Sequence, residues 1–433
     1  MAVYCPAMAT IKPFRAQRFS PDAGELAHSV APPYDVISSQ GREELGSLSP
    51  YNTVWLTLPE AEPDDRSKFV KYGRSSSRLS AWREDGTLVV DDRPNLYRYR
   101  QSFTDPVSGK RLTRESIICL IKTEPYEKGV VLPHEQTFPK HKEDRLRLLE
   151  ATRTHLECIY GLYEDTQDAV AGALKSADFD VVANITTDDG IEHELARTDS
   201  ADDLVRVEKA FDSERVWIAD GHHRYETAVS FRQSLGELPG PVPEDYMMIA
   251  LSGMDDPGLI LLPTHRIVEN FPVPLDQIEP KLRERFETRE IANTEILGAL
   301  LEVKDSETRA FGVALPGGIG LFVTTTADEA LSWVHGTGSD LLKKLDVTIL
   351  HDAILRDLFG IEGMDKVGYT RDAGEAIDAV ETRPNTVAFL MNPPSVSDMR
   401  LIAMGGEKMP QKSTYYYPKL LSGLVFWSMT DLT

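Results

Sequence analysis

The segment Asp220-Gly221-His222-His223-Arg224 combines residue types that suit phosphate chemistry. It follows the apolar run Val216 to Ala219, which predicts a short buried strand. A helix is expected directly after it, from Tyr225 to Leu235. The start of a helix presents backbone N–H groups and a partial positive charge, so this strand–turn–helix is a natural anion site.

Each side chain of the segment has a plausible role at such a site. Gly221 lets the backbone approach a phosphate closely, and Arg224 can hold two phosphate oxygens at once. His222 and His223 can donate hydrogen bonds or transfer protons, and Asp220 can hold a magnesium ion. The alternative is an ordinary turn in which Asp220 caps the helix and one histidine is buried.

A second group of polar residues follows the apolar run Val130 to Leu132. It contains His134, Glu135 and Thr137, but it lacks the second histidine of the HExxH zinc motif. Loops after strands commonly bind ligands, and Glu135 is a candidate general base for a hydroxyl proton. A surface loop that starts a helix is the alternative.

Two further segments are candidates for the same pocket. Thr264, His265 and Arg266 follow a strand expected at Leu259 to Leu262, and their alternative is a solvated strand-end turn. The tail from Met409 to Lys419 holds Ser413, Thr414 and Lys419, which suit phosphate or carboxylate binding. The alternative for the tail is a tyrosine-rich edge strand packed on the core.

Composition excludes several classes of function. The chain has 433 residues with 47 basic and 69 acidic side chains, and its net charge of −22 disfavours nucleic acids and anionic membranes. The 3 cysteines have no CxxC spacing and predict neither a disulfide framework nor a zinc finger. No signal peptide, membrane span or P-loop is evident, so we expect a cytoplasmic protein.

Strand and helix patterns alternate along the chain, which predicts a mixed α/β fold. The run Asn52 to Leu58 is expected to be a buried strand, and residues 346–358 a helix. Two strands at Ala310 to Leu315 and Gly318 to Val323 are expected to form a hairpin. Pro272 to Pro274 is the candidate linker.

Six separated segments resemble the DUF1015 family of domains of unknown function. The resemblance covers roughly residues 10–427 and rests on segments that keep the same order. They are Pro32 to Ile37, Leu132 to Glu135, Asp144 to Leu146, Ala219 to Ala228, Leu262 to Arg266, and Met409 to Lys419. The family looks like a branch of the ParB/sulfiredoxin-like superfamily.

That resemblance implies a catalytic core with added regions. It implies an N-terminal α/β region at 1–125, a ParB/sulfiredoxin-like catalytic region at 126–271, and a C-terminal α/β region at 272–433. The superfamily includes free L-serine kinases, which carry a D-G-H-x-R segment at the nucleotide phosphates and make O-phospho-L-serine. Sulfiredoxin has a cysteine where this chain has His222, so sulfinic-acid repair is not expected.

The implied function is a magnesium-dependent kinase for free L-serine with ATP or ADP as donor. In that interpretation the catalytic residues are Glu135, Asp220, His222, His223 and Arg224, with Asp220 also contacting Mg²⁺. Nucleotide or phosphate would contact Gly221, Arg224, Thr264, His265, Arg266 and Lys419, and the substrate would contact His134, Thr137, Ser413 and Thr414. The alternatives are a nucleotide hydrolase, a kinase for another alcohol, a nucleotide-binding regulatory protein, or a metal-dependent hydrolase. The sequence does not predict the oligomeric state.

Overall fold

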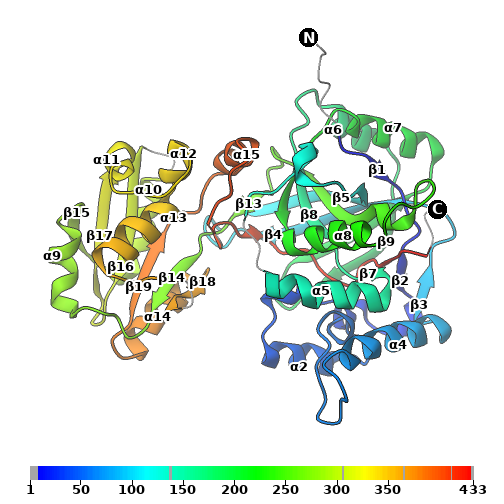
Figure 1. Cartoon of the computed structure of the whole chain (residues 1–433), viewed down its shortest axis with the longest axis horizontal. Coiled ribbons are helices and arrows are strands. Elements are labelled where there is room, and N and C mark those ends of the chain that lie inside the picture. The colour runs from blue at the N-terminus through cyan, green and yellow to red at the C-terminus, as the bar shows by residue number, and fades with distance from the viewer. Residues whose placement is uncertain (1–7, 136–138, 305–306, 364–365, 411, 431–433) are drawn as a thin grey trace. The chain divides into compact units, whose positions relative to one another are not determined.

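The chain folds into two compact units, each of which is discontinuous in sequence (Figure 1). The structure is a computed structural model that describes residues 8–135, 139–304, 307–363, 366–410 and 412–430. Unit 1 comprises residues 1–133, 137–260 and 418–433, and unit 2 comprises residues 134–136 and 261–417. The predicted limits at 125 and 271 do not coincide with these boundaries.

Unit 1 is built on a mixed sheet that has nine strands among the described residues. Eight of them lie in the order β6-β11-β8-β12-β5-β4-β10-β9, and β1 pairs with β5. Two neighbouring pairs, β11 with β6 and β12 with β8, are parallel, whereas the other pairs are antiparallel. The strands are β1 (Ile11–Lys12), β4 (Leu96–Thr104), β5 (Arg111–Lys122), β6 (Val131–Leu132), β8 (Ile159–Tyr163), β9 (Asp180–Thr186), β10 (Glu192–Thr198), β11 (Val216–Asp220) and β12 (Tyr246–Gly253).

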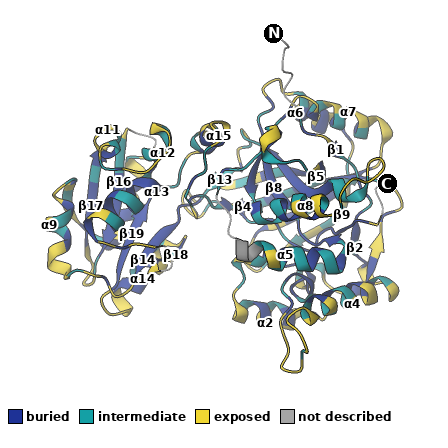
Figure 2. Ribbon diagram, viewed as in Figure 1, coloured by how far each residue is buried: buried dark blue, intermediate teal, exposed yellow. Residues whose placement is uncertain are grey.

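Helices cover this sheet and bury its central strands. The longer helices are α2 (Ser39–Leu48), α4 (Val70–Glu84), α5 (Pro139–Thr152), α6 (Ala169–Ser176), α7 (Ala201–Phe211) and α8 (His222–Ser234). Helix α8 packs on β8 and β12, and α5 packs between α8 and α4. Strands β8, β11 and β12 are almost wholly buried, whereas the outer faces of α2, α4 and α7 are exposed (Figure 2). The sheet is therefore a firm support for the loops at its strand ends.

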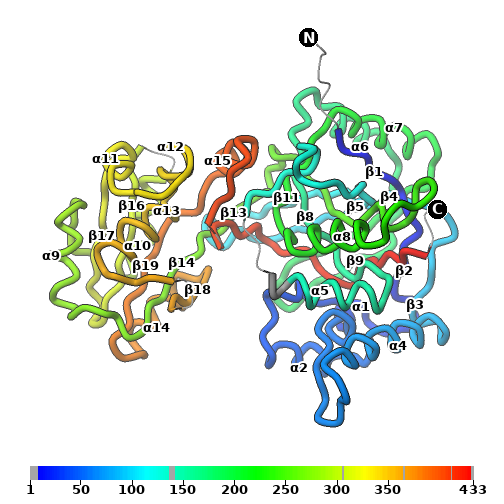
Figure 3. The backbone as a smooth tube through the Cα atoms, viewed as in Figure 1, coloured from blue at the N-terminus to red at the C-terminus, as the bar shows by residue number. Residues whose placement is uncertain are grey.

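The last described segment of the chain returns to unit 1 after unit 2 is complete (Figure 3). Strand β21 (Trp427–Ser428) pairs with β7 (Thr154–His155), and Phe426 bridges to Gln17 in β2 (Gln17–Phe19). Unit 1 is consequently assembled from both ends of the described chain.

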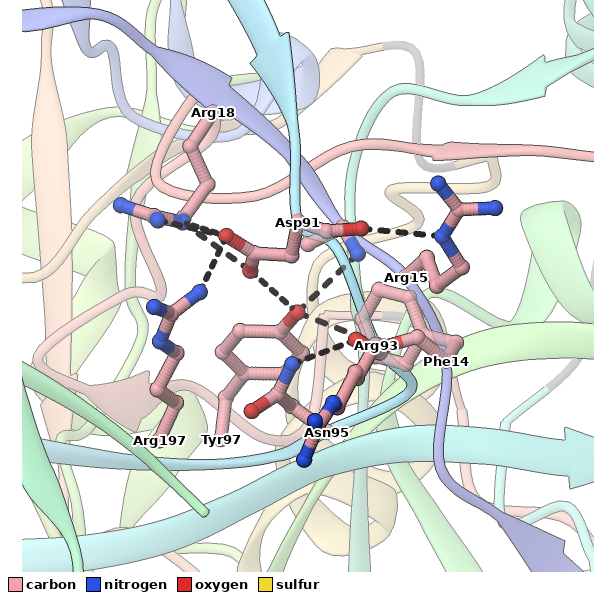
Figure 4. A network of polar contacts seen from close by, with 9 residues as sticks. Phe14, Arg15, Arg18, Asp91, Arg93, Asn95, Tyr97 and Arg197 are labelled. Atoms are coloured by element: carbon pink, nitrogen blue, oxygen red, sulfur yellow. Dashed lines mark hydrogen bonds and ion pairs between the residues drawn. The ribbon is translucent and has the colours of Figure 1, made fainter. Parts of the chain in front are cut away.

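A buried carboxylate, Asp91, connects several strands of unit 1 through hydrogen bonds (Figure 4). Its side chain is only 3% exposed and accepts hydrogen bonds from Arg18 (2.6 Å), Arg197 (2.5 Å) and the hydroxyl of Tyr97 (2.7 Å). Its backbone carbonyl accepts a further bond from Arg15 Nε at 2.9 Å. Arg18, Tyr97 and Arg197 lie on β2, β4 and β10, so one anion links three strands of the unit.

Unit 2 is a second α/β layer structure. Its sheet has six strands among the described residues, in the order β15-β17-β16-β19-β14-β18, and all its pairs are antiparallel. The strands are β14 (His265–Val268), β15 (Glu287–Ala292), β16 (Thr308–Ala314), β17 (Ile319–Thr326), β18 (Gly368–Thr370) and β19 (Val387–Met391). The helices are α9 (Ile278–Leu282), α10 (Ile296–Glu302), α11 (Ala327–Leu331), α12 (Asp340–Lys343), α13 (Asp346–Ile349), the π-helix Leu350–Leu358, α14 (Ala373–Thr382) and α15 (Val396–Met404).

Alternate residues of β19 show how this sheet is covered on both faces. Ala388 and Leu390 belong to the apolar cluster with α10 and α14. Phe389 contacts Phe359, which follows the π-helix, with ring centroids 6.2 Å apart. The alternation is that of a strand buried on both sides.

The mixed α/β class predicted from the sequence is confirmed, as are the β16–β17 hairpin and the helical segment at 346–358. The strand predicted at Asn52 to Leu58 is wrong, because helix α3 (Val54–Thr57) occupies it. The Asn52 side-chain oxygen accepts the N–H of Val54, while its amide donates to the carbonyls of His28 and Val30. These bonds start a helical turn inside an apolar run.

Among the described residues, no helix is both long and apolar enough to span a membrane. Cys119 and Cys158 are free thiols, and burial raises the pKa of Cys158 to about 12.

Replacing Asp91 with Asn keeps the shape of the side chain but removes the charge that faces two guanidinium groups. We expect D91N to lower the free energy of unfolding by about 2 kcal/mol or more, because both arginines lose their shared carboxylate. The measurement is urea unfolding of each purified variant. D92N is the matched control, since Asp92 is exposed, and it should change stability by less than about 0.5 kcal/mol. Equal stability of the two variants would show that the Asp91 network contributes nothing measurable.

Candidate functional site

The candidate site of unit 1 lies where β11 meets α8. Strand β11 ends at Asp220, Gly221 adopts a left-handed backbone with φ +94°, and α8 begins at His222. The helix therefore starts three residues before the predicted Tyr225, so the histidines and Arg224 form its first turn. The N–H of Tyr225 donates to the carbonyl of Gly221 at 3.0 Å and closes that turn.

Gly221 is required here for two physical reasons. Its positive φ is a conformation that residues with a Cβ atom adopt at a cost. A Cβ atom at this position would also lie 2.6 Å from Cγ2 of Ile159 on the neighbouring strand β8. The turn is thus fixed both by its own backbone and by the packing against the sheet.

Asp220 stands between two cations. Its carboxylate is 3.1 Å from Nζ of Lys419 and 3.5 Å from a guanidinium nitrogen of Arg224. Burial raises the pKa of Asp220, but the charges of Lys419 and Arg224 outweigh it and bring the pKa down to about 2. Asp220 is consequently ionised at neutral pH, and Lys419, one of the residues predicted to contact phosphate, lies beside it.

Arg224 is held in place by polar groups around it. One terminal nitrogen donates to the carbonyl of Cys158 at 2.7 Å and lies 3.9 Å from the carboxylate of Glu157. Burial lowers the pKa of Arg224, yet the carboxylates of Glu157 and Asp220 outweigh it and raise the pKa above its ordinary value. Its side chain is 11% exposed, and its buried Nε has no hydrogen-bond partner among the described residues. A guanidinium in this state retains capacity for an incoming anion.

Glu157 and Tyr34 complete the surroundings of Arg224, and the sequence did not single out Glu157. The carboxylate of Glu157 accepts the backbone N–H of Tyr34 (3.1 Å) and the hydroxyl of Ser422 (2.9 Å). The Tyr34 ring lies 4.1 Å from the guanidinium of Arg145 and 5.9 Å from that of Arg224. Tyr34 belongs to the Pro32 to Ile37 motif, and this motif was the feature of the sequence that could have indicated a contact with Arg224.

His222 and His223 occupy the first turn of α8. His222 is 6% exposed, and its charge contributes to the low pKa of Asp220. His223 is half-buried. Both therefore lie within the same charged junction as Asp220.

The remaining predicted site residues that the structure describes lie in unit 2, and several of them are brought together there. His134 Nε2 lies 2.8 Å from Oγ1 of Thr414, and the His134 carbonyl accepts the N–H of Met409 at 2.7 Å. The carboxylate of Glu135 accepts the N–H of Lys412 at 3.3 Å. The hydroxyl of Ser413 donates to the carbonyl of Pro410 at 2.5 Å. Thr137 lies outside the described residues.

The segment Thr264 to Arg266 is not the solvated turn that was the alternative interpretation. His265 and Arg266 begin strand β14, and Arg266 is 1% exposed. Arg266 donates through Nε to His351 Nε2 at 3.2 Å and through a terminal nitrogen to the carbonyl of Lys412 at 3.4 Å. Burial lowers its pKa to about 10. Arg266 thus links β14 to the loop that contacts Glu135.

A divalent metal fits the unit 1 site only through Asp220. Among the described residues, no group of three or more His, Cys, Asp or Glu side chains could hold a metal ion. Mg²⁺ commonly binds through one or two carboxylates together with substrate phosphates, and the ionised Asp220 suits that mode. The carboxylates of Asp220 and Glu157 already balance the charges of Arg224 and Lys419, so an incoming polyphosphate would need further positive charge.

Comparison with known proteins gives one sequence match and several structural ones. The profile of a family described as "Protein of unknown function (DUF1015)" matches residues 11–348. None of the curated proteins matches the chain.

The similar solved structures are distant. A mutant free serine kinase in complex with ADP has 12% identity and a TM-score of 0.33, covering 66% of this chain and 84% of its own. A conserved hypothetical protein from Pyrococcus furiosus has 14% identity and a TM-score of 0.33, covering 70% and 94%. C-terminally truncated SbnI from Staphylococcus aureus has 11% identity and a TM-score of 0.35, covering 71% and 86%.

Substitution of Gly221 by Ala tests the constraint on the junction. We expect G221A to destabilise unit 1 by more than the roughly 1–2 kcal/mol of a left-handed alanine, because the new methyl group also meets Ile159. G236A is the control, since Gly236 has φ +69° but open space around its missing Cβ. Urea unfolding of both variants gives the comparison. Equal losses of stability would mean that the contact with Ile159 does not restrict the turn.

Proposed function

We propose that this chain, which belongs to the DUF1015 family, binds a nucleotide at the β11–α8 junction and transfers a phosphoryl group from it to a small alcohol. The observation that carries this proposal is the grouping of Asp220, Arg224 and Lys419 at the first turn of α8. Two cations and a helix N-terminus favour phosphate, and a half-buried, ionised carboxylate lies beside them.

Phosphoryl transfer requires mainly positioning and charge stabilisation. Arg224 would hold the oxygens of the transferring phosphate, and Lys419 would stabilise charge beside it. The backbone of Gly221 lets the phosphate approach the first turn of α8, while His222 or His223 would donate hydrogen bonds to it. Glu157 keeps Arg224 in place through the contacts described above, so we consider it a positioning residue.

Mg²⁺, when bound with the nucleotide, would contact Asp220 and supply the positive charge that the balanced side chains lack. The acceptor hydroxyl attacks the terminal phosphorus of ATP or ADP, and the bond between that phosphorus and the bridging oxygen breaks. The hydroxyl proton passes to a general base. We propose Glu135 as that base from the order of the motifs along the chain.

We propose free L-serine as the acceptor, because Asp220, Gly221, His222 and Arg224 match the D-G-H-x-R segment of free-serine kinases. Thr264, His265, Arg266, His134, Thr137, Ser413 and Thr414 stay candidates for contacts with nucleotide or substrate. A hydrolase would use water in place of serine, and a regulatory protein would bind nucleotide without turnover.

The first test is a panel assay. Purified protein is incubated with Mg²⁺, ATP or ADP, and each free amino acid, and ³¹P NMR detects the products. O-phosphoserine formed only with serine is the expected result. Inorganic phosphate alone would identify a hydrolase, and thermal stabilisation by nucleotide without any product would identify a binding protein.

Three variants test the assigned roles. We expect D220N, R224K and E135Q each to lower kcat/KM by about 10²–10³-fold, because each removes a charge or geometry needed in the transition state. Lysine at 224 retains the charge but loses the planar fork that binds two oxygens. Q233A is the control, since Gln233 is exposed on the same helix and should leave kcat/KM unchanged. Wild-type turnover in folded D220N and R224K would overturn the assignment of the site, whereas wild-type turnover in E135Q alone would remove only the base.

A further inference from the structure

A cavity of about 310 Å³ lies within unit 2, where the central strands β16 and β19 of its sheet begin and end. Strand β16 begins beside the loop that follows β19, because the two strands are antiparallel with Phe311 opposite Met391. The wall is formed by the start of β16, by residues of α12 and α13, and by the loop 392–395 that leads into α15. The cavity has the volume of a site for a small ligand. It shares no residue with the candidate site of unit 1.

Two charged side chains in this wall lack hydrogen-bond partners at the atoms that face each other. Arg309 Nε and Asp346 Oδ1 form an ion pair at 3.7 Å, a distance that is too long for a hydrogen bond. Both atoms are buried, and neither has a hydrogen-bond partner among the described residues. A buried donor and a buried acceptor that make no hydrogen bond each lower the stability of the protein, because neither regains the hydrogen bond to water that it lost on burial. A ligand that accepts from Arg309 and donates to Asp346 would satisfy both.

The charges around the pair have both signs. Burial raises the pKa of Asp346 to about 7, with Arg309 opposing and Asp398 adding to the rise. Asp398, at the start of α15, therefore lies close enough to influence Asp346, and it also lines the cavity. Lys344 also lines the cavity and carries a positive charge, and it pairs with Asp328 at 2.6 Å. A phosphate would be repelled by the carboxylates of Asp346 and Asp398, and a simple amine would be repelled by Arg309 and Lys344. A ligand with only one sign of charge is therefore disfavoured in this cavity.

We propose that this cavity binds a free α-amino acid, with its carboxylate on Arg309 and its ammonium group on Asp346. The amino nitrogen and a carboxyl oxygen of an α-amino acid are about 3 Å apart by standard bond lengths. The two groups can therefore address neighbouring protein atoms that lie 3.7 Å apart. Val347, Leu345 and Pro393 supply apolar surface for a short side chain. The proposal does not rest on the proposed kinase function, since binding here needs neither nucleotide nor phosphoryl transfer.

The wild-type protein can test this proposal without any substitution. Isothermal titration of the full chain is carried out with each free L-amino acid in the absence of nucleotide. The amino acid that binds best is then compared with the amine that lacks its carboxylate and the acid that lacks its amino group. We expect both analogues to bind about tenfold or more weaker, because each leaves one protein group unsatisfied. Binding of either analogue as tightly as the amino acid would overturn the proposal, as would no binding at about 10 mM.

Two variants locate the binding at this cavity. R309M keeps the length of the side chain and removes the guanidinium, and D346N keeps the shape and removes the charge. Each should weaken binding about tenfold or more, while R289M, which changes an exposed arginine on β15 of the same sheet, should not. If R309M does not fold, D346N and the two analogues still decide the question. Unchanged affinity in a folded R309M or D346N would place the amino acid elsewhere and refute the site.

Discussion

The left-handed turn at Gly221 is the constraint on which the candidate site depends. It lets α8 begin directly at the end of β11, and Ile159 on the adjacent strand leaves no room for a side chain there. Asp220 and Arg224 consequently stand on the two sides of one tight turn, 3.5 Å apart. A longer or looser connection would separate the carboxylate from the guanidinium, and neither would lie at the start of the helix.

The charges at this turn are balanced by parts of the chain that are remote in sequence. Glu157 lies beside Arg224 and is itself held by Tyr34 and Ser422, while Lys419 neutralises Asp220. Burying so many ions is costly unless each has a partner, and here the described contacts provide one for each. The site therefore contains two carboxylates and two cationic side chains, and their charges largely cancel. If the proposed nucleotide binds here, a counter-ion has to accompany it, because the charges of the side chains already offset each other.

The sequence predicted what depends on local pattern and failed where distant contacts decide. The strand, glycine and arginine of residues 216–224 follow each other directly, so the order strand–turn–helix could be inferred, although the start of the helix could not. Asn52 turns an apolar run into a helix through bonds to His28 and Val30, which no periodicity reveals. Glu157 has no motif around it, because its importance comes only from Arg224 beside it in space. The separation of Glu135 and Asp220 into different compact units was equally invisible in the one-dimensional order of motifs.

The return of residues 418–430 to unit 1 has a consequence for the protein during its synthesis. Lys419, Ser422 and strand β21 leave the ribosome only after the whole of unit 2 has been translated. Until then the nascent chain lacks the ammonium group that faces Asp220 and the hydroxyl that binds Glu157. The first 133 residues can begin to collapse early, since domains generally fold as they emerge, but the charged site stays incomplete. Prematurely terminated chains would thus lack the cation beside Asp220 and the hydroxyl beside Glu157, a state that quality-control proteases could distinguish from the finished protein.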